Sequence, residues 1–512
     1  MSDSALPGVD NETALLVWAV QSCGPAPRLR PLDTDRLLHL CNVHKMTHRL
    51  FARLEAEQPS SVPVSVLTAL RLRRLHIERQ SRAQIECARD IDKIARRATG
   101  KPALWIKGFS VYALTGKREH RHPSGDLDLL CADPAALFDA LVEAGYTGYV
   151  HERAAGEVGH EWATLESNGV SIEIHGHYPS NVYPDGLKRN DPAFGVCTGH
   201  RIQPCTNFRV HQIGYDDLSP YSCLASGGDT AGLTVLSPAA CAFLLCLHEC
   251  RSFIVPVFWN AHTFLLSTIA DVFDLACRPD FNRRAFAALC RTHHANDAAR
   301  FIGTLLAAYF GRDPLTGQKA DAPFVFPRTL TSFGGWLAFD TPYSLLSPLD
   351  ENRFWSALGL NEVCVPAYKK SAVYTLGGDA PTLLSAITQN PEKARLPFRF
   401  TLSQEDRVVY LDTVFPTPLS ARDAYDVQSV AFTGQYQTLR WVYVGKQGGD
   451  VRYGGDPLLR GVVVESAGRG YRMRLPLFTL RDRRSDLRRL LVFKKNANPL
   501  TIVPVRFLCE AA

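Results

Sequence analysis

The sequence predicts an α+β fold, in which a mixed sheet is flanked by helical segments and followed by an antiparallel, sandwich-like β-domain. Three patterns predict it. Apolar residues recur at helical spacing before residue 100 and again after residue 236. Short segments of alternating polar and apolar residues lie between these two blocks. Beyond residue 397, short β-rich runs alternate with turn residues, which is typical of an antiparallel sandwich.

A chain of 512 residues is long enough for about three domains, and its composition suggests four segments. We expect an N-terminal helical segment (1–100), a mixed-sheet core (101–235), a helical domain (236–320) and a β-rich C-terminal domain (321–512). In the first segment, the amphipathic run 64–97 predicts one long helix that ends before Lys101-Pro102. The arginines of this helix are expected on a solvated face.

Within the core, the patterns follow the order strand, helix, strand, helix and hairpin. The expected elements are 103–107, 108–115, 126–131, 135–144 and 161–178. Asp133-Pro134 supplies a capping carboxylate and a first-turn proline for the second helix, and Gly145 ends that helix. Asn168-Gly169 is a strong signal for a two-residue hairpin turn. Residues 179–235 are rich in turn formers and predict irregular, partly extended structure.

Two aspartates on one strand are the most informative feature of the core. Asp126 and Asp128 are two residues apart, so they share a face of the strand, while Leu127 and Leu129 turn into the core. Two anions held side by side repel each other. A hard divalent cation such as Mg²⁺ offsets this repulsion and brings substrate phosphates to the same place.

A third carboxylate lies downstream in a strictly alternating segment. Glu173, His175 and His177 fall on one face of the run 170–177, and the isoleucines fall on the other. Next to the aspartates, Glu173 would complete a site for two metal ions. The histidines are open to two interpretations, a direct contact with metal or acceptor and a hydrogen bond that holds a carboxylate.

The order of these motifs resembles an uncharacterised nucleotidyltransferase family of bacteria, in the DNA polymerase beta-like nucleotidyltransferase superfamily. The motifs that carry the resemblance are Ile106-Lys107-Gly108, Tyr112, Arg121, Asp126-Leu127-Asp128-Leu129-Leu130, Gly145-Tyr146 and Ile172-Glu173-Ile174-His175. The resemblance extends over about residues 10–312 and leaves out the last 200. Phe109 follows Gly108 where the superfamily usually has a second small residue.

The resemblance implies a nucleotidyltransferase fold for the core and a role for each motif. Asp126 and Asp128 would bind two Mg²⁺ ions, and Glu173 would hold the ion next to the attacking hydroxyl. Two alternatives stay open for the proton of that hydroxyl: Glu173 takes it, or metal ligation alone suffices to activate the hydroxyl. The residues expected to contact the triphosphate are Lys107, Gly108, Arg121, Ser124 and Gly125. Lys107 and the Gly108 amide stand where a strand meets a helix N-terminus, which favours anions. His248 and Asp271 either face the nucleotide pocket or are a core histidine and a surface acid.

The function expected is the transfer of a nucleoside monophosphate from a nucleoside triphosphate, with ATP as the expected donor, to a hydroxyl or amine. A small molecule or peptide is the expected acceptor. Nucleic acid is not expected, because the net charge is only +6 and no basic surface interleaved with aromatic residues is recognisable. Two alternatives remain open: a catalytically inactive nucleotide-binding or scaffold protein, and a carbohydrate-recognition protein acting through its C-terminal β-domain.

The sequence also predicts a cytoplasmic protein. Its first residues lack the basic and apolar blocks of a signal peptide. The apolar stretch 253–273 is interrupted by Pro256, Asn260 and His262, so we expect a buried helical hairpin and no contact with a membrane. Fourteen cysteines without paired spacing predict free thiols in a reducing compartment.

Overall fold

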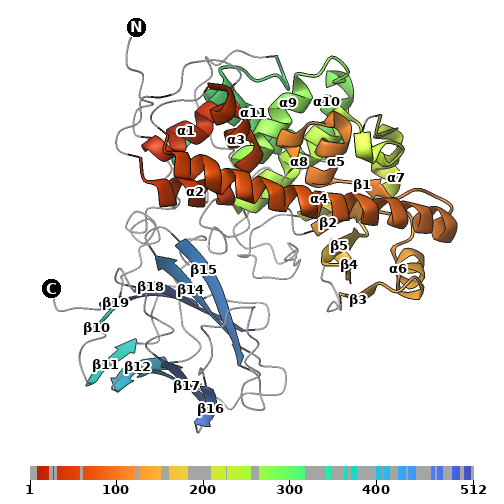
Figure 1. Ribbon diagram of the computed structural model, residues 1–512. Coiled ribbons are helices and arrows are strands. Elements are labelled where there is room, and N and C mark those ends of the chain that lie inside the picture. The colour runs from red at the N-terminus through yellow and green to blue at the C-terminus, as the bar shows by residue number, and fades with distance from the viewer. Residues whose placement is uncertain are drawn as a thin grey trace.

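The structure is a computed structural model, and its arrangement is shown in Figure 1. It describes residues 9–21, 27, 32–57, 62–121, 126–151, 161–182, 209–226, 228–254, 265–317 and 342–346, and further strands between 363 and 508. The four-segment division of the chain stays a prediction.

The central sheet of the described core is mixed, and its strand order is β3-β4-β5-β2-β1-β9-β8. The strands are β1 (Leu104–Trp105), β2 (Asp126–Leu130), β3 (Thr147–Val150), β4 (Glu161–Ser167), β5 (Val170–His175), β8 (Ser222–Leu224) and β9 (Thr234–Leu236). β2 runs parallel to β5 and β1 runs parallel to β9, while the other neighbours are antiparallel. The predicted mixed sheet is therefore confirmed.

The predicted hairpin turn fixes the register of β4 and β5. Ser167 pairs with Val170 across the turn, and Asn168 and Gly169 have φ of 51° and 75°. Two successive positive φ values belong to the turn that Asn-Gly favours. β5 also pairs with β2, in parallel, and that second pairing places Ser171 beside Asp126 and Glu173 beside Asp128.

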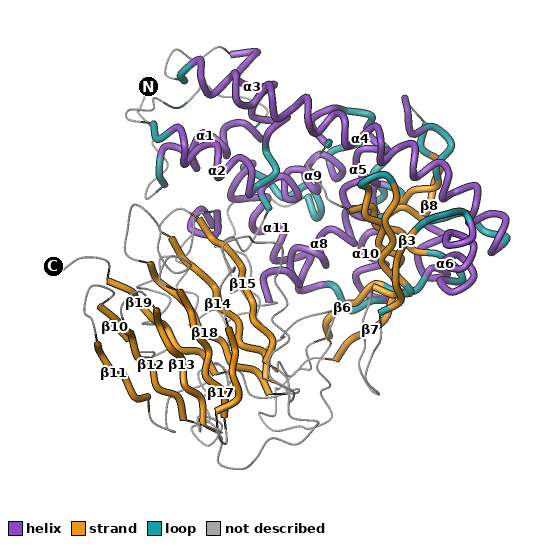
Figure 2. The backbone as a smooth tube through the Cα atoms, turned by 60° about the horizontal axis from the view of Figure 1, so that its bottom comes forward, coloured by secondary structure: helices purple, strands orange, loops and turns teal. Residues whose placement is uncertain are grey.

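Some of the helices pack against strands of the sheet, and others form a bundle beside it (Figures 1 and 2). They are α1 (Asn11–Val20), α2 (Thr34–Val43), α3 (Thr47–Glu57), α4 (Val64–Thr99), α5 (Lys107–Thr115), α6 (Pro134–Glu143), α7 (Tyr215–Leu218), α8 (Pro238–Ile254), α9 (Leu266–Ala276), α10 (Arg283–Thr292) and α11 (Asn296–Phe310). The helices that pack against strands of the sheet are α4, α5, α6 and α8. The predicted long helix is α4, which packs against α2 and α3 and also against α6 and β5. It joins the bundle to the sheet.

The caps of α6 follow the sequence signals. The Asp133 carboxylate accepts hydrogen bonds from the amides of Ala135 and Ala136 at 3.1 and 3.0 Å. Gly145 follows the helix with φ of 92°, which costs glycine little. These contacts confirm the predicted start and end of the helix.

Two hydrophobic cores support this arrangement. Leu127, Leu129, Ile172 and Ile174 are fully buried in the core between the sheet, α4 and α6. The second core lies within the helical bundle and includes residues of α1, α3, α8, α9 and α11. The alternation predicted for β2 and β5 is confirmed, since their apolar residues face inward and their carboxylates face the other way.

Within the predicted irregular region 179–235, the described residues 179–182, 209–226 and 228–235 form more regular structure than predicted. Strands β6 (Tyr178–Val182) and β7 (Arg209–Ile213) form a separate antiparallel pair, and β8 and β9 extend the central sheet. The predicted strand 103–107 is shorter, because Lys107 already belongs to α5. β9 was missed because three residues are too few to show a period.

The stretch 253–273 lies partly outside the described residues. α8 and α9, which border it, pack against each other, as a helical hairpin requires. No helix in the described ranges is long and apolar enough to cross a membrane. The cysteines in these ranges are free thiols, most of them buried.

The C-terminal strands form two sheets with the orders β10-β19-β18-β14-β15 and β11-β12-β13-β17-β16. They are β10 (Val363–Pro366), β11 (Ser371–Leu376), β12 (Arg399–Glu405), β13 (Val408–Val414), β14 (Tyr425–Thr433), β15 (Tyr436–Val444), β16 (Val463–Ala467), β17 (Gly470–Pro476), β18 (Leu487–Lys495) and β19 (Thr501–Leu508). Their packing as a sandwich stays a prediction.

Glu249 on α8 provides a prediction about stability. Burial raises the pKa of this carboxyl to about 7 from its ordinary 4.5. The folded protein therefore favours the protonated form of Glu249. As the pH rises from 4.5 to about 7, this carboxyl lowers the free energy of unfolding progressively. Glu249→Gln keeps an acceptor for the Leu265 amide. It should increase the free energy of unfolding by about 3 kcal/mol at pH 8 and by much less at pH 5. Urea unfolding at both pH values tests this, and an equal gain at both would contradict it.

Candidate functional site

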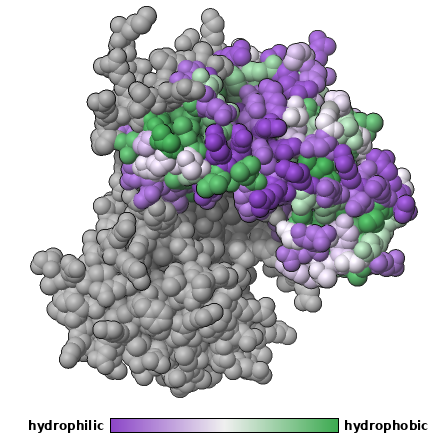
Figure 3. All heavy atoms as spheres, in the orientation of Figure 1, coloured by the Kyte–Doolittle hydropathy of each residue, from purple (hydrophilic) through white to green (hydrophobic). Residues whose placement is uncertain are grey.

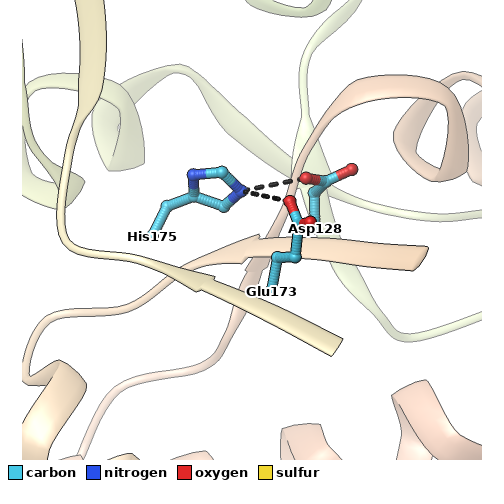
Figure 4. Close-up of side chains that lie close together, drawn as sticks. All are labelled: Asp128, Glu173 and His175. Atoms are coloured by element: carbon cyan, nitrogen blue, oxygen red, sulfur yellow. Dashed lines mark hydrogen bonds and ion pairs between the residues drawn. The ribbon is translucent and has the colours of Figure 1, made fainter. Parts of the chain in front are cut away.

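Three side chains on β2 and β5 come together at the centre of the sheet, as Figure 4 shows. Asp128 pairs directly with Glu173 in the register of the two strands. His175 Nε2 lies 2.9 Å from Asp128 Oδ1 and 3.7 Å from Glu173 Oε2. One ligand atom of each residue lies within 4.8 Å of the other two. The predicted meeting of a third carboxylate with the aspartate strand is confirmed.

Lys107 joins this cluster from the start of α5. Its ammonium group forms a hydrogen-bonded ion pair with Asp128 and lies 3.8 Å from Glu173 Oε2. Burial by itself would lower the pKa of Lys107, but the charge of Asp128, the hydrogen bond to it and the nearby Tyr178 and Glu173 together outweigh burial and raise it, so the lysine is charged. Its φ of 54° is unusual for a residue with a side chain, and such backbone strain is typical of functional sites.

The electrostatics of the two carboxylates differ. Burial disfavours ionised Asp128, but the charge of Lys107 and the hydrogen bond from His175 lower its pKa. Burial, and then the charge of Asp128, raise the pKa of Glu173 to about 9. The single positive charge of Lys107 therefore does not neutralise the negative charges of both carboxylates. A divalent cation would do so, and two carboxylates are oxygen donors of the kind that Mg²⁺ prefers. The residues present fit such an ion.

His175 is completely buried and its pKa is lowered, first by burial, so the imidazole is neutral. A neutral imidazole whose Nε2–H donates to Asp128 holds that carboxylate in place. This geometry favours the second of the two interpretations of His175. His177 follows the end of β5 and does not belong to the cluster.

A pocket opens beside the cluster, between the sheet and the helical bundle. Five of the predicted site residues line it: Lys107, Gly108, Arg121, Asp126 and Asp128. Asp126 is half-buried and lies outside the cluster formed by Asp128, Glu173 and His175. The structure thus brings both aspartates to one pocket but places Glu173 closest to Asp128.

Arg121 is held at the pocket by Asp229. Its guanidinium group lies 2.8 Å from Asp229 Oδ2, donates to the Tyr112 hydroxyl and lies 4.4 Å from the centre of the Tyr112 ring. These contacts fix the side chain that was predicted to bind phosphate. Ser124 and Gly125 lie outside the described residues.

His248 and Asp271 also line the pocket. This agrees with the first of the two interpretations of these residues, in which they face the nucleotide pocket. His248 Nδ1 lies 2.9 Å from the hydroxyl of the buried Tyr178. Asp271 is almost completely buried and accepts from Arg49 at 2.7 Å, and its Oδ1 lies 2.9 Å from His120 Nδ1. Asp271 is therefore not a surface acid.

Sequence reasoning missed Lys45, Arg49 and His120. Lys45 and His120 line the pocket, and Arg49 lies beneath it. Arg49 is 222 residues from its partner Asp271. No local sequence pattern indicates that these three residues reach the pocket or its base, because none of them belongs to a recognisable motif.

Arg49→Leu is expected to reduce the free energy of unfolding by about 3–5 kcal/mol, because it leaves the buried carboxylate of Asp271 without its charge partner. Urea unfolding measures the loss. Lys93→Leu is the control, since it removes an exposed ion pair with Asp90 and should change stability by less than about 1 kcal/mol. Equal effects of the two variants would contradict the prediction.

A family model described as an uncharacterised nucleotidyltransferase matches residues 30–311. No curated protein and no solved structure matches the chain. The matched region contains β1, β2 and β5 with the carboxylate cluster, the residues that line the pocket and the helices α2 to α11. It begins after α1 and ends before the C-terminal sheets. The chain belongs to this uncharacterised nucleotidyltransferase family.

Proposed function

We propose that the protein is a Mg²⁺-dependent nucleotidyltransferase of the DNA polymerase beta-like superfamily. It would transfer a nucleoside monophosphate from a nucleoside triphosphate, with ATP as the expected donor, to a hydroxyl or amine of a small molecule or peptide. The observation that carries the proposal is the pairing of Asp128 with Glu173 beside Lys107, at the edge of a pocket that Asp126 also lines.

In this proposal the acceptor oxygen or nitrogen attacks the α-phosphorus, the bond to the β-phosphate bridging oxygen breaks, and pyrophosphate leaves. Asp126, Asp128 and Glu173 would hold two Mg²⁺ ions, which when bound lower the pKa of the attacking group and neutralise charge on the phosphates. Glu173 would accept the proton of the acceptor. His175 keeps Asp128 oriented through the bond at 2.9 Å.

Lys107 and the Gly108 amide stand at the first turn of α5, where free backbone amides and the helix dipole favour triphosphate oxygens. Arg121, held by Asp229, supplies a second oriented cation at the pocket. Ser124 and Gly125 keep their proposed role in binding the β- and γ-phosphates.

The test is release of pyrophosphate and transfer of label from each of the four α-³²P-labelled nucleoside triphosphates, with Mg²⁺ and a mixture of small alcohols, amines and peptides. Calorimetric titration of the full chain with Mg-ATP, Mg-CTP and sugars accompanies it. Nucleotide binding without transfer would favour the inactive nucleotide-binding alternative. Binding of sugars alone would favour carbohydrate recognition and refute the proposal.

A further inference from the structure

The turn between α2 and α3 carries a lysine in an unfavourable backbone conformation. After α2 ends, the Lys45 amide donates to the Asn42 carbonyl at 3.1 Å. The Met46 amide donates to the Cys41 carbonyl at 2.8 Å. These two bonds form a Schellman motif, whose left-handed position is usually glycine. Lys45 occupies that position with φ of 53°, which disfavours any residue with a side chain. Glycine at this position would therefore make the fold more stable than lysine does.

This turn is firmly attached to the start of α9. His44 Nδ1 accepts from the Leu266 amide at 3.4 Å, and the His44 carbonyl accepts from the Ser267 amide at 3.3 Å. His44 Nε2 can then donate to the Leu346 carbonyl, 2.9 Å away. His44 is completely buried. The backbone that carries Lys45 is therefore fixed in place before any ligand arrives.

Lys45 lines the same pocket as Asp126, Asp128 and Lys107. The other strong cations at the pocket are already paired: Lys107 with Asp128, and Arg121 with Asp229. In the described part of the chain, the ammonium group of Lys45 forms no ion pair, and Glu249 attracts it only through space. Its charge is the one most available to an anionic ligand.

We propose that Lys45 binds the phosphate groups of the nucleoside triphosphate, so that the N-terminal helices complete the binding site. This inference rests on the proposed function and adds a residue that none of the sequence motifs contains. Backbone strain that lowers stability is common at functional sites, where a side chain is retained because it binds a ligand. Lys45 fits this pattern, since it strains the turn and brings a positive charge to the pocket. The inference thus predicts opposite effects of one substitution on stability and on binding.

Lys45→Gly in the full chain tests this. The variant removes the charge and relieves the left-handed strain, so its melting temperature should equal or exceed that of the wild type. Its affinity for the Mg-nucleoside triphosphate that the wild type binds most tightly, among ATP, GTP, CTP and UTP, should fall about 10-fold to 100-fold. Its affinity for the corresponding nucleoside should stay unchanged. Lys45→Arg keeps both charge and strain and should bind the triphosphate within about tenfold of the wild type.

His294→Gly is the matched control. His294 follows α10 with φ of 57°, and the amides of His294 and Ala295 donate to Arg291 and Cys290 at 3.5 and 2.8 Å, which repeats the motif of Lys45. His294 is exposed and does not line the pocket. The same relief of strain should therefore leave triphosphate affinity unchanged.

Three results would overturn the inference. Unchanged triphosphate affinity of Lys45→Gly would show that the lysine does not bind phosphate. Equal losses of affinity for the triphosphate and for the nucleoside would show that Lys45 does not contact the phosphate groups. A wild-type protein that binds none of the four triphosphates would remove the proposed function, and this inference with it; the first two results leave the proposed function intact.

Discussion

Asp128→Asn is expected to reduce nucleotidyl transfer by about three orders of magnitude or more. The substitution keeps the volume of the side chain but removes the charge that pairs with Lys107 and that would hold Mg²⁺. Asp126→Asn should also abolish transfer, since Asp126 lines the same pocket. The measurement is the rate of pyrophosphate release with saturating Mg²⁺ and nucleotide.

Stability should change little in Asp128→Asn. Burial, and then the charge of Asp128, raise the pKa of Glu173. Removing the charge of Asp128 lets Glu173 ionise more readily and pair with Lys107, which lies 3.8 Å away. Asp139→Asn on the exposed face of α6 is the control and should retain full activity. Near-wild-type turnover by Asp128→Asn or Asp126→Asn would refute the two-metal mechanism.

Glu173→Gln should slow transfer by about 10²-fold to 10⁴-fold, because Glu173 is proposed both to hold the metal at the acceptor and to take the proton. Affinity for the nucleoside triphosphate should change much less, because the aspartates hold the metal on the triphosphate. Single-turnover rates and nucleotide titrations separate the two effects. Glu166→Gln, on the exposed side of β4, is the matched control. A variant that loses nucleotide affinity but keeps its rate at saturation would reverse the assigned roles.

The faces of β2 and β5 that carry the carboxylates could be predicted because their signals are local, whereas the pairing of these two strands was expected from the family resemblance. Alternation places Asp126 and Asp128 on one face, and Asn168-Gly169 fixes the register of the strand that carries Glu173. The long helix α4 was equally clear, since its apolar positions repeat over many turns. In each case a repeating or local pattern in the sequence is enough to predict the element and the face on which its residues lie.

The rest of the site depends on how distant segments pack. Lys45, Arg49 and His120 reach the pocket or its base from a turn, a helix and a short 3₁₀ segment that carry no catalytic motif. The strain at Lys45 is likewise visible only in the backbone. The role of His175 became clear from its burial and its distance to Asp128, whereas alternation alone showed only which face it shares.

The parallel pairing of β2 with β5 has a consequence for folding order. Asp128 and Glu173 are neighbours in space, yet α6, β3 and β4 lie between them in the chain. Parallel strands cannot be joined by a tight turn, so the intervening chain must close as a loop before the two carboxylates meet. The hairpin of β4 and β5 can form early, because its contacts are local, but the repulsive pair is assembled only when β5 docks onto β2. The two carboxylates are thus held together only after the long loop between their strands has closed.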